Sequence, residues 1–193
     1  MAFTHTNRKG DQCYLHKGRT KKGNPKYFFS RKADGELLDE IPAGYELYEN
    51  PNGLVFLRTV QPRMFSDEEI AIVGNGMRNY TDLEFYKIDV KGNAIIILLP
   101  LQDVEPIKEV ISQFSLKTPA EINHTLQRII TFAPEMQLVL TDKEKRLFSL
   151  KRYCYRGMGS WISLETSSDL KSLAKKCFKH SAKESAFDLL PEF

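Results

Sequence analysis

The residues best suited to binding an anionic ligand lie between Tyr14 and Lys32, the densest run of positive charge in the chain. Glycine, asparagine and proline at its centre predict an exposed turn between two strands. Cations on such a turn can contact phosphates, and an aromatic ring on the adjoining strand can stack on a base. The alternative is a solubilising turn above a strand that is buried on one face. The candidate nucleic-acid contacts here are Arg19, Lys21, Lys22, Lys26 and Tyr27.

The second strand of this stretch, Lys26 to Arg31, carries aromatic residues on both faces. Tyr27 and Phe29 share one face, whereas Phe28 lies on the other. One aromatic face can therefore enter the core while the other offers a stacking surface.

A second candidate anion site is the predicted strand from Lys151 to Arg156. Arg152 and Arg156 share one strand face, and two guanidiniums placed in this way can grip phosphates or carboxylates. Tyr153 and Tyr155, on the other face, can stack on a base or pack in the core. Ion pairing of the arginines with the acidic middle of the chain is the alternative.

The predicted last helix, from about Asp169 to Leu190, repeats lysine at every fourth position: Lys171, Lys175, Lys179 and Lys183. Like charges at this spacing repel by a few tenths of a kcal/mol per pair, and a bound polyanion relieves that repulsion. Lys175 and Lys179 therefore join the candidate nucleic-acid-binding residues. A solvated helix face is the alternative.

Two Cys-x-x-His pairs, Cys13 with His16 and Cys177 with His180, together supply the ligand types of a Cys₂His₂ zinc site. Residues three apart are neighbours on a helix but point to opposite faces of a strand, which is the structure predicted for the first pair. Cys177 also falls in the apolar stripe of its helix. We therefore predict no metal and no cofactor.

A third pattern, Asp82, Glu84, Asp89 and Lys91, contains the residue types of a magnesium-dependent nuclease. In such a site carboxylates hold the metal while a lysine faces the developing charge. The spacing is loose and falls at the end of a predicted hairpin. No Ser/His/Asp or Cys/His arrangement is apparent, so a non-enzymatic protein is favoured and a metal-dependent hydrolase is the weaker alternative.

The composition fits an ordinary globular protein, because 41% of the 193 residues are hydrophobic and 27% are charged. No apolar run approaches the ~20 residues of a membrane span, and the N-terminus lacks the apolar segment of a secretory signal. The three widely spaced cysteines are typical of reduced thiols. These features predict a cytoplasmic protein that does not enter a membrane.

The net charge of +3 hides a strong asymmetry along the chain. Residues 1–32 carry a net +8, residues 33–142 a net −10 and residues 143–193 a net +5. The two basic ends could form one positive face, or each could dock on the acidic middle segment.

The elements that must position these residues predict two domains, a basic β-rich module at 1–62 and an α+β domain at 63–193. Leu54 to Leu57 is apolar on both faces, which is typical of a strand in the centre of a sheet. Capping boxes at Ser66 and Thr118 begin two helices, and Gly74 and Gly76 weaken the second half of the first. The predicted fold class is α+β: a small antiparallel hairpin module, then a mixed, mainly antiparallel sheet with three to four helices.

Three stretches resemble a family of uncharacterised bacterial proteins: GRTKKGNP at 18–25, IPAGYELYENP at 41–51 with VFLR at 55–58, and RYCYRG at 152–157. The resemblance covers most of the chain and implies a bacterial, cytoplasmic protein. It carries no activity, cofactor or site residue.

The sequence therefore predicts a non-enzymatic protein that binds nucleic acid or another polyanion through the basic hairpin and the Lys-rich last helix. The alternative is a protein-interaction or assembly subunit, with a protein partner or a homo-oligomer, because the hairpin at residues 45–57 is apolar and the charges are segregated.

Overall fold

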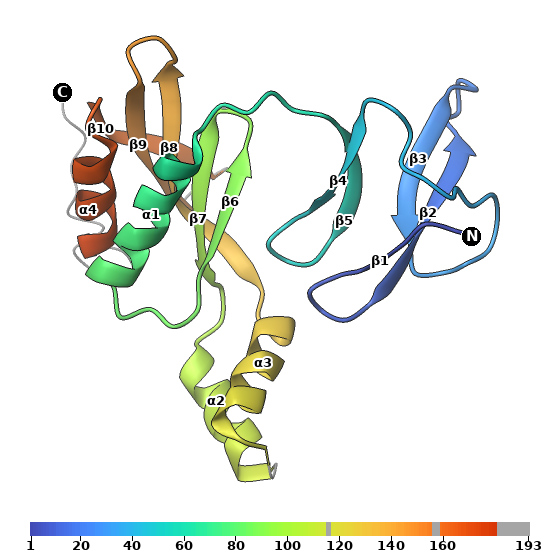
Figure 1. Ribbon diagram of the computed structural model, residues 1–193. Helices are drawn as coiled ribbons and strands as arrows, with labels where there is room; N and C mark the ends of the chain where they lie inside the picture. Colours follow the sequence, from blue (N-terminus) through green and yellow to red (C-terminus); the bar gives the residue numbers. More distant parts are fainter. Residues whose placement is uncertain (115–116, 156–158, 181–193) are drawn as a thin grey trace. The chain divides into compact units, whose positions relative to one another are not determined.

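The computed structural model describes residues 1–114, 117–155 and 159–180. Within these residues the chain forms four helices and ten strands, and the strands make three antiparallel sheets (Figure 1). This confirms the predicted α+β class. The chain divides into two compact units, each built from two segments. Unit 1 is Met1–Gln61 with Gln102–Thr131, and unit 2 is Pro62–Leu101 with Phe132–Phe193.

Unit 1 contains a three-stranded sheet in the order β1-β2-β3, formed by Thr4–Thr6, Gln12–Arg19 and Pro25–Ser30. In its register Leu15 lies opposite Phe29 and His16 opposite Phe28. Leu15 is fully buried and Phe3 contacts the ring of Phe29, so this is the inner face of the sheet. Phe28 therefore points to the outer face, because neighbouring residues of a strand alternate.

A separate two-stranded sheet pairs β4 (Tyr45–Glu49) with β5 (Val55–Thr59). The prediction of a central strand at Leu54 to Leu57 is wrong: within the described residues β5 pairs only with β4. Phe56 is 46% exposed and Leu54 57% exposed, because only one face of this ribbon packs on the unit. A run of apolar residues predicts that a segment is hydrophobic. It does not predict which element covers each of its faces.

The turns of these two sheets are fastened together by polar contacts. Asn7 is buried and donates its amide to the Gly53 carbonyl at 2.7 Å. Glu49 accepts from Arg8 Nε at 2.9 Å and lies 2.9 Å from His5 Nε2. Burial alone would raise the pKa of Glu49, but these bonds from His5 and Arg8 lower it overall.

Helices α2 (Val104–Phe114) and α3 (Pro119–Ile129) complete unit 1. The predicted capping box at Thr118 is confirmed, since its side chain accepts from the Glu121 N–H. Arg128 of α3 donates to the Lys9 carbonyl at 2.7 Å, which ties α3 to the β1–β2 turn.

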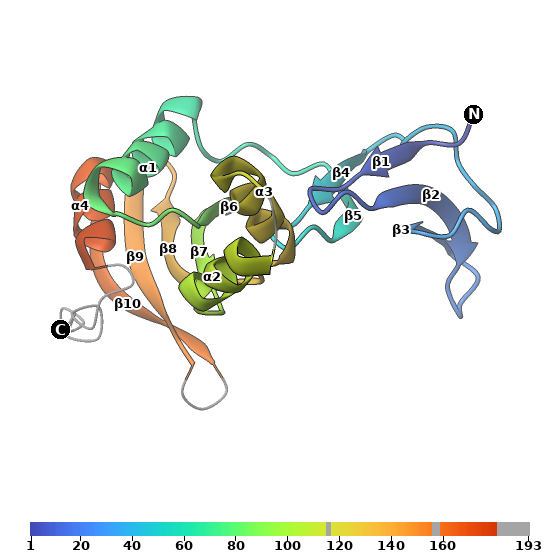
Figure 2. The ribbon, with the colours of Figure 1, turned by 90° about the horizontal axis from the view of Figure 1, so that it is seen from below.

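Unit 2 is built on a five-stranded sheet in the order β10-β9-β8-β7-β6. Helices α1 (Asp67–Tyr80) and α4 (Leu170–His180) lie on the same side of this sheet (Figure 2), and their apolar residues share one buried cluster with it. No helix in the described part of the chain is both long and apolar enough to span a membrane. The strands are Lys87–Lys91, Ala94–Pro100, Phe132–Asp142, Leu147–Cys154 and Ser160–Ser167 for β6 to β10.

Helix α1 begins at the predicted capping box, in which Ser66 and Glu69 bond to each other's backbone N–H groups. Contrary to the expected weakening, the helix continues through Gly74 and Gly76 to Tyr80. A Cβ at Gly76 would lie 2.6 Å from the ring of Phe178, so glycine there permits close packing of α1 against α4.

Candidate functional site

The basic turn between β2 and β3 is held by its own hydrogen bonds. Gly23 N–H donates to the Thr20 carbonyl at 2.9 Å, and Asn24 N–H donates to Thr20 Oγ1 at 3.1 Å. Gly23 has φ +83°, a conformation that a residue with a side chain rarely adopts. Lys21 and Lys22 thus project from a fixed, fully exposed turn.

Beside this turn, Phe28 presents an aromatic ring on the outer face of the sheet. The ring is stacked on His16, with centroids 5.1 Å apart and an interplanar angle of 10°, and it remains 39% exposed. Lys26 Nζ lies 5.7 Å from the centroid of the same ring. Opposite Lys26, Gly18 leaves room for the ring, since a Cβ there would lie 3.3 Å from it. Aromatic ring and cation together form a surface on which a base can stack.

His16 is a fixed support for this ring. It is buried, and its Nε2 lies 2.9 Å from the carbonyl oxygen of Lys32. Because a carbonyl oxygen only accepts, Nε2 must carry the proton. The imidazole is therefore held flat beneath Phe28.

Tyr27, the predicted stacking residue, lies on the inner face of the strand. It is half-buried and contacts Tyr45 edge-on, with centroids 5.4 Å apart. Phe28, which was not among the predicted contacts, is the ring of the pair Tyr27 and Phe28 that stays exposed. The alternation of residues along the strand predicted that Phe28 and Tyr27 lie on opposite faces. Deciding which face is exposed required knowing that β4 covers one of them.

The cations of the hairpin differ in their partners. Lys17 pairs with Glu36 at 3.3 Å and Arg31 with Asp11 at 2.7 Å, so both charges are balanced locally. The four cations predicted as nucleic-acid contacts, Arg19, Lys21, Lys22 and Lys26, are exposed at or next to the turn. Positive charge is thus concentrated at the turn.

The structure describes only part of the second predicted anion site, whose assembly stays a prediction. Arg152 is half-buried and lies in register with Met136 and Ile162, on the face of the sheet that α1 and α4 cover. Arg156 lies outside the described residues. Tyr153 contacts Trp161, with ring centroids 5.0 Å apart, and the Tyr155 hydroxyl donates to the Pro134 carbonyl at 2.5 Å.

The lysine ridge of α4 is exposed at Lys171, Lys175 and Lys179, as its spacing predicts. Lys175 Nζ lies 5.9 Å from the centroid of the Tyr80 ring. Lys176, alongside the ridge, is paired with Glu165 of β10. Lys183 lies outside the described residues.

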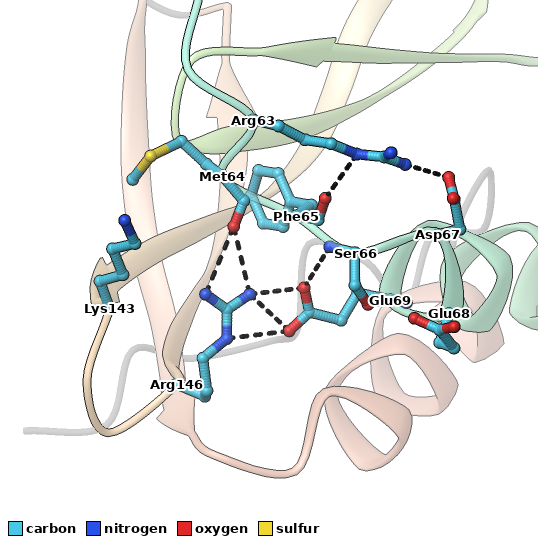
Figure 3. A pocket seen from close by; sticks show the side chains of 9 residues that line it. All are labelled: Arg63, Met64, Phe65, Ser66, Asp67, Glu68, Glu69, Lys143 and Arg146. Atoms are coloured by element: carbon cyan, nitrogen blue, oxygen red, sulfur yellow. Dashed lines mark hydrogen bonds and ion pairs between the residues drawn. The ribbon is translucent and has the colours of Figure 1, made fainter.

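A hollow of about 580 Å³ borders the N-terminal end of α1 (Figure 3). Arg146 donates to Glu69 at 3.0 Å and to the Met64 carbonyl at 3.3 Å. Burial alone would raise the pKa of Glu69, but the bonds from Arg146 and from the Ser66 N–H lower it overall. Arg63 similarly bonds the Phe65 carbonyl and Asp67. These polar groups hold the hollow's own walls together.

Arg146 occupies a strained position, with φ +48°. Its contact with Glu69 joins residues 77 apart in the chain, so no local sequence pattern reveals it. The position of its guanidinium, between a carboxylate and a carbonyl, identifies Arg146 as a clamp between the β8–β9 turn and the start of α1.

The described residues hold no group of three or more His, Cys, Asp or Glu able to bind a metal ion. Burial raises the pKa of the Cys13 thiol, although the charge of the nearby Arg31 acts in the opposite direction. The raised pKa disfavours the thiolate that zinc requires. The Cys177 sulfur lies in the core of unit 2, 3.1 Å from that of Met136. Asp89 and Lys91 lie on β6, whereas Asp82 and Glu84 precede it.

No protein-family model, curated protein or solved structure matches this chain. The resemblance to a family of uncharacterised bacterial proteins stays a prediction.

Proposed function

We propose that this protein binds single-stranded nucleic acid without sequence specificity, through the end of the β2–β3 hairpin. The observation that supports this most is the Phe28 ring, stacked on buried His16 and partly open beside exposed cations. An aromatic platform within a positive surface serves any base, because every base has a flat face.

The electrostatic part of the proposal rests on Lys21 and Lys22. Both project from a fixed turn, so little conformational freedom of the backbone is lost when they contact phosphates. Lys175 and Lys179 of α4 are proposed as a second set of phosphate contacts. The three free cysteines favour a cytoplasmic location.

The test measures binding of fluorescent single- and double-stranded oligonucleotides over a range of salt concentrations. Single strands should bind more tightly than duplexes, and replacing Phe28 with leucine should weaken binding about tenfold. Phe56→Leu is the matched control, since it removes an exposed ring from the other sheet. Equal affinity of Phe28→Leu and the wild type would reject the stacking site, and no binding at low salt would reject the function.

A second candidate function is self-association through the outer face of β4–β5. Leu54, Phe56 and Val60 are all exposed on this ribbon, as expected for a surface that another chain covers. Light scattering should then detect an oligomer that Phe56→Ser disrupts. A monomer at all concentrations would exclude this candidate.

A further inference from the structure

A groove of about 420 Å³ runs between α1 and α4 in unit 2, separate from the hollow at the start of α1. Beside it, Gly76 of α1 lies directly against Phe178 and near Ala174 of α4. The volume lies within the range of small-molecule sites. Its lining residues are Ile72, Asn75, Gly76, Asn79, Tyr80, Lys171 and Ala174.

The groove combines an apolar floor with polar groups at its rim. Asn75 and Asn79 are one helical turn apart on α1 and both line it. The Asn75 side-chain oxygen accepts from Arg78 at 2.6 Å, which leaves its amide N–H groups as donors. Asn79 carries both a donor and an acceptor, the combination through which a carboxamide pairs with adenine.

The charged side chains that the structure describes at the groove are cations. Lys171 lines it, and Lys175 lies against Tyr80, another lining residue. Arg78 adds a third cation through its bond to Asn75. Among the described residues, no carboxylate lines this groove. The surface therefore complements a ligand that is flat and apolar in one part and anionic in another.

We propose that this groove binds one nucleotide, with the base on the Gly76–Ala174 floor, its edge at Asn75 and Asn79, and its phosphate at Lys171 and Lys175. The nucleotide can come from a free nucleoside 5′-phosphate or from one residue of a single strand. The inference deepens the proposed function. It rests on that function only if the nucleotide belongs to a single strand. It adds base recognition to the lysine ridge.

The experiment uses calorimetry to measure the binding of four ligands to the full-length protein: AMP, UMP, inorganic phosphate and a single-stranded oligonucleotide. AMP should bind, and Asn79→Ala should weaken it about tenfold, as expected for a lost hydrogen bond between polar groups in a groove. Lys171→Ala should weaken AMP by a similar factor or more. Asn79 and Lys171 are exposed, so thermal melting should show both variants folded.

Two controls separate this site from the hairpin. Lys143→Ala, in the hollow at the start of α1, should leave AMP binding unchanged. The double variant Lys21→Ala with Lys22→Ala should weaken the oligonucleotide and leave AMP unchanged. The groove and the hairpin can therefore fail independently.

The outcomes decide both the site and the source of the ligand. Binding of the oligonucleotide alone, weakened by Asn79→Ala, supports the groove and assigns its nucleotide to a strand. AMP affinity that Asn79→Ala and Lys171→Ala do not change overturns the proposal. If inorganic phosphate binds as tightly as AMP, the groove does not recognise the base. The same conclusion follows if no binding depends on Asn79.

Discussion

Two hollows border helix α1, and their cations are used differently. At its N-terminal end, Arg63 and Arg146 are each bonded to a carboxylate and to a backbone carbonyl. The groove beside Gly76 is lined by Lys171, and in the part of the chain that the structure describes it has no carboxylate in its lining. A basic residue that is already bonded to groups of its own fold is therefore poor evidence for an anionic ligand. The first hollow is larger, whereas the second is the one proposed to bind an anion.

The largest effect should come from breaking the clamp at the first hollow. Arg146→Ala leaves the largely buried Glu69 carboxylate with only its capping bond, so it should lower the free energy of unfolding by about 2–3 kcal/mol. Urea denaturation measures this loss. Lys143→Ala, at the rim of the same hollow, should stay within ~0.5 kcal/mol of the wild type. Equal stability of the two variants would contradict the structural role of Arg146.

The strained backbone of Arg146 provides a finer comparison. Glycine adopts φ +48° without the steric cost that alanine meets. Arg146→Gly should therefore be more stable than Arg146→Ala by about 0.5–1 kcal/mol, although both lose the same ion pair. The reverse order would show that the φ angle costs nothing.

At the second hollow, Gly76→Ala should lower the free energy of unfolding by about 1–2 kcal/mol, because its methyl group would meet the Phe178 ring. Gly74→Ala is the matched control on the same helix. Its Cβ would meet only the end of the Arg78 side chain at 3.9 Å, so it should be neutral or stabilise by up to ~1 kcal/mol. Thermal melting compares them, and equal melting temperatures would contradict the close packing of α1 and α4.

Lowering the pH should reduce the stability that the contact between Glu69 and Arg146 gives at the first hollow. Because the pKa of Glu69 is lowered, its carboxylate stabilises the fold fully above the ordinary pKa of a glutamate. This stability is lost as the pH falls through the lowered pKa. Urea midpoints of the wild type should therefore fall more than those of Glu69→Gln between pH 7 and pH 3. Parallel curves would show that Glu69 gains nothing from Arg146.

The smallest effect on stability is expected at the basic turn of unit 1. Replacing Lys21 and Lys22 with alanine removes exposed charges, so the free energy of unfolding should change by less than ~0.5 kcal/mol. The salt dependence of single-strand binding should nevertheless become shallower by about 1.4 if both lysines contact phosphates. The control pair Lys143→Ala with Lys145→Ala should leave that slope unchanged. A loss of stability with unchanged binding would make the turn structural.

Local signals in the sequence predicted much of the fold. The capping boxes at Ser66 and Thr118 are each contained within four residues, and both begin helices as expected. The glycine-containing turns between hairpin strands are local in the same way. The α+β class follows from these elements taken together.

The sequence could not predict which face of each element is covered. Phe28 and Tyr27 are adjacent and similar, and only the position of Tyr45 decides which of them is exposed. The exposure of β5 and the clamp at Arg146 have the same origin, since each depends on segments distant in the chain. The candidate site was therefore predictable in its charges but not in its stacking residue or its groove.

The pairing of β7 with β8 bears on how the chain is made. The two strands are neighbours in the sheet of unit 2, yet residues 101–131, with α2 and α3, lie between them in the sequence. At about 5–20 residues per second, a ribosome needs about 2–6 seconds to add that segment. During this time Ile95 to Leu98 has no β8 to pair with, and an open apolar strand edge is where nascent chains associate. The segment that carries α2 and α3 therefore sets how long this edge of β7 stays open during synthesis.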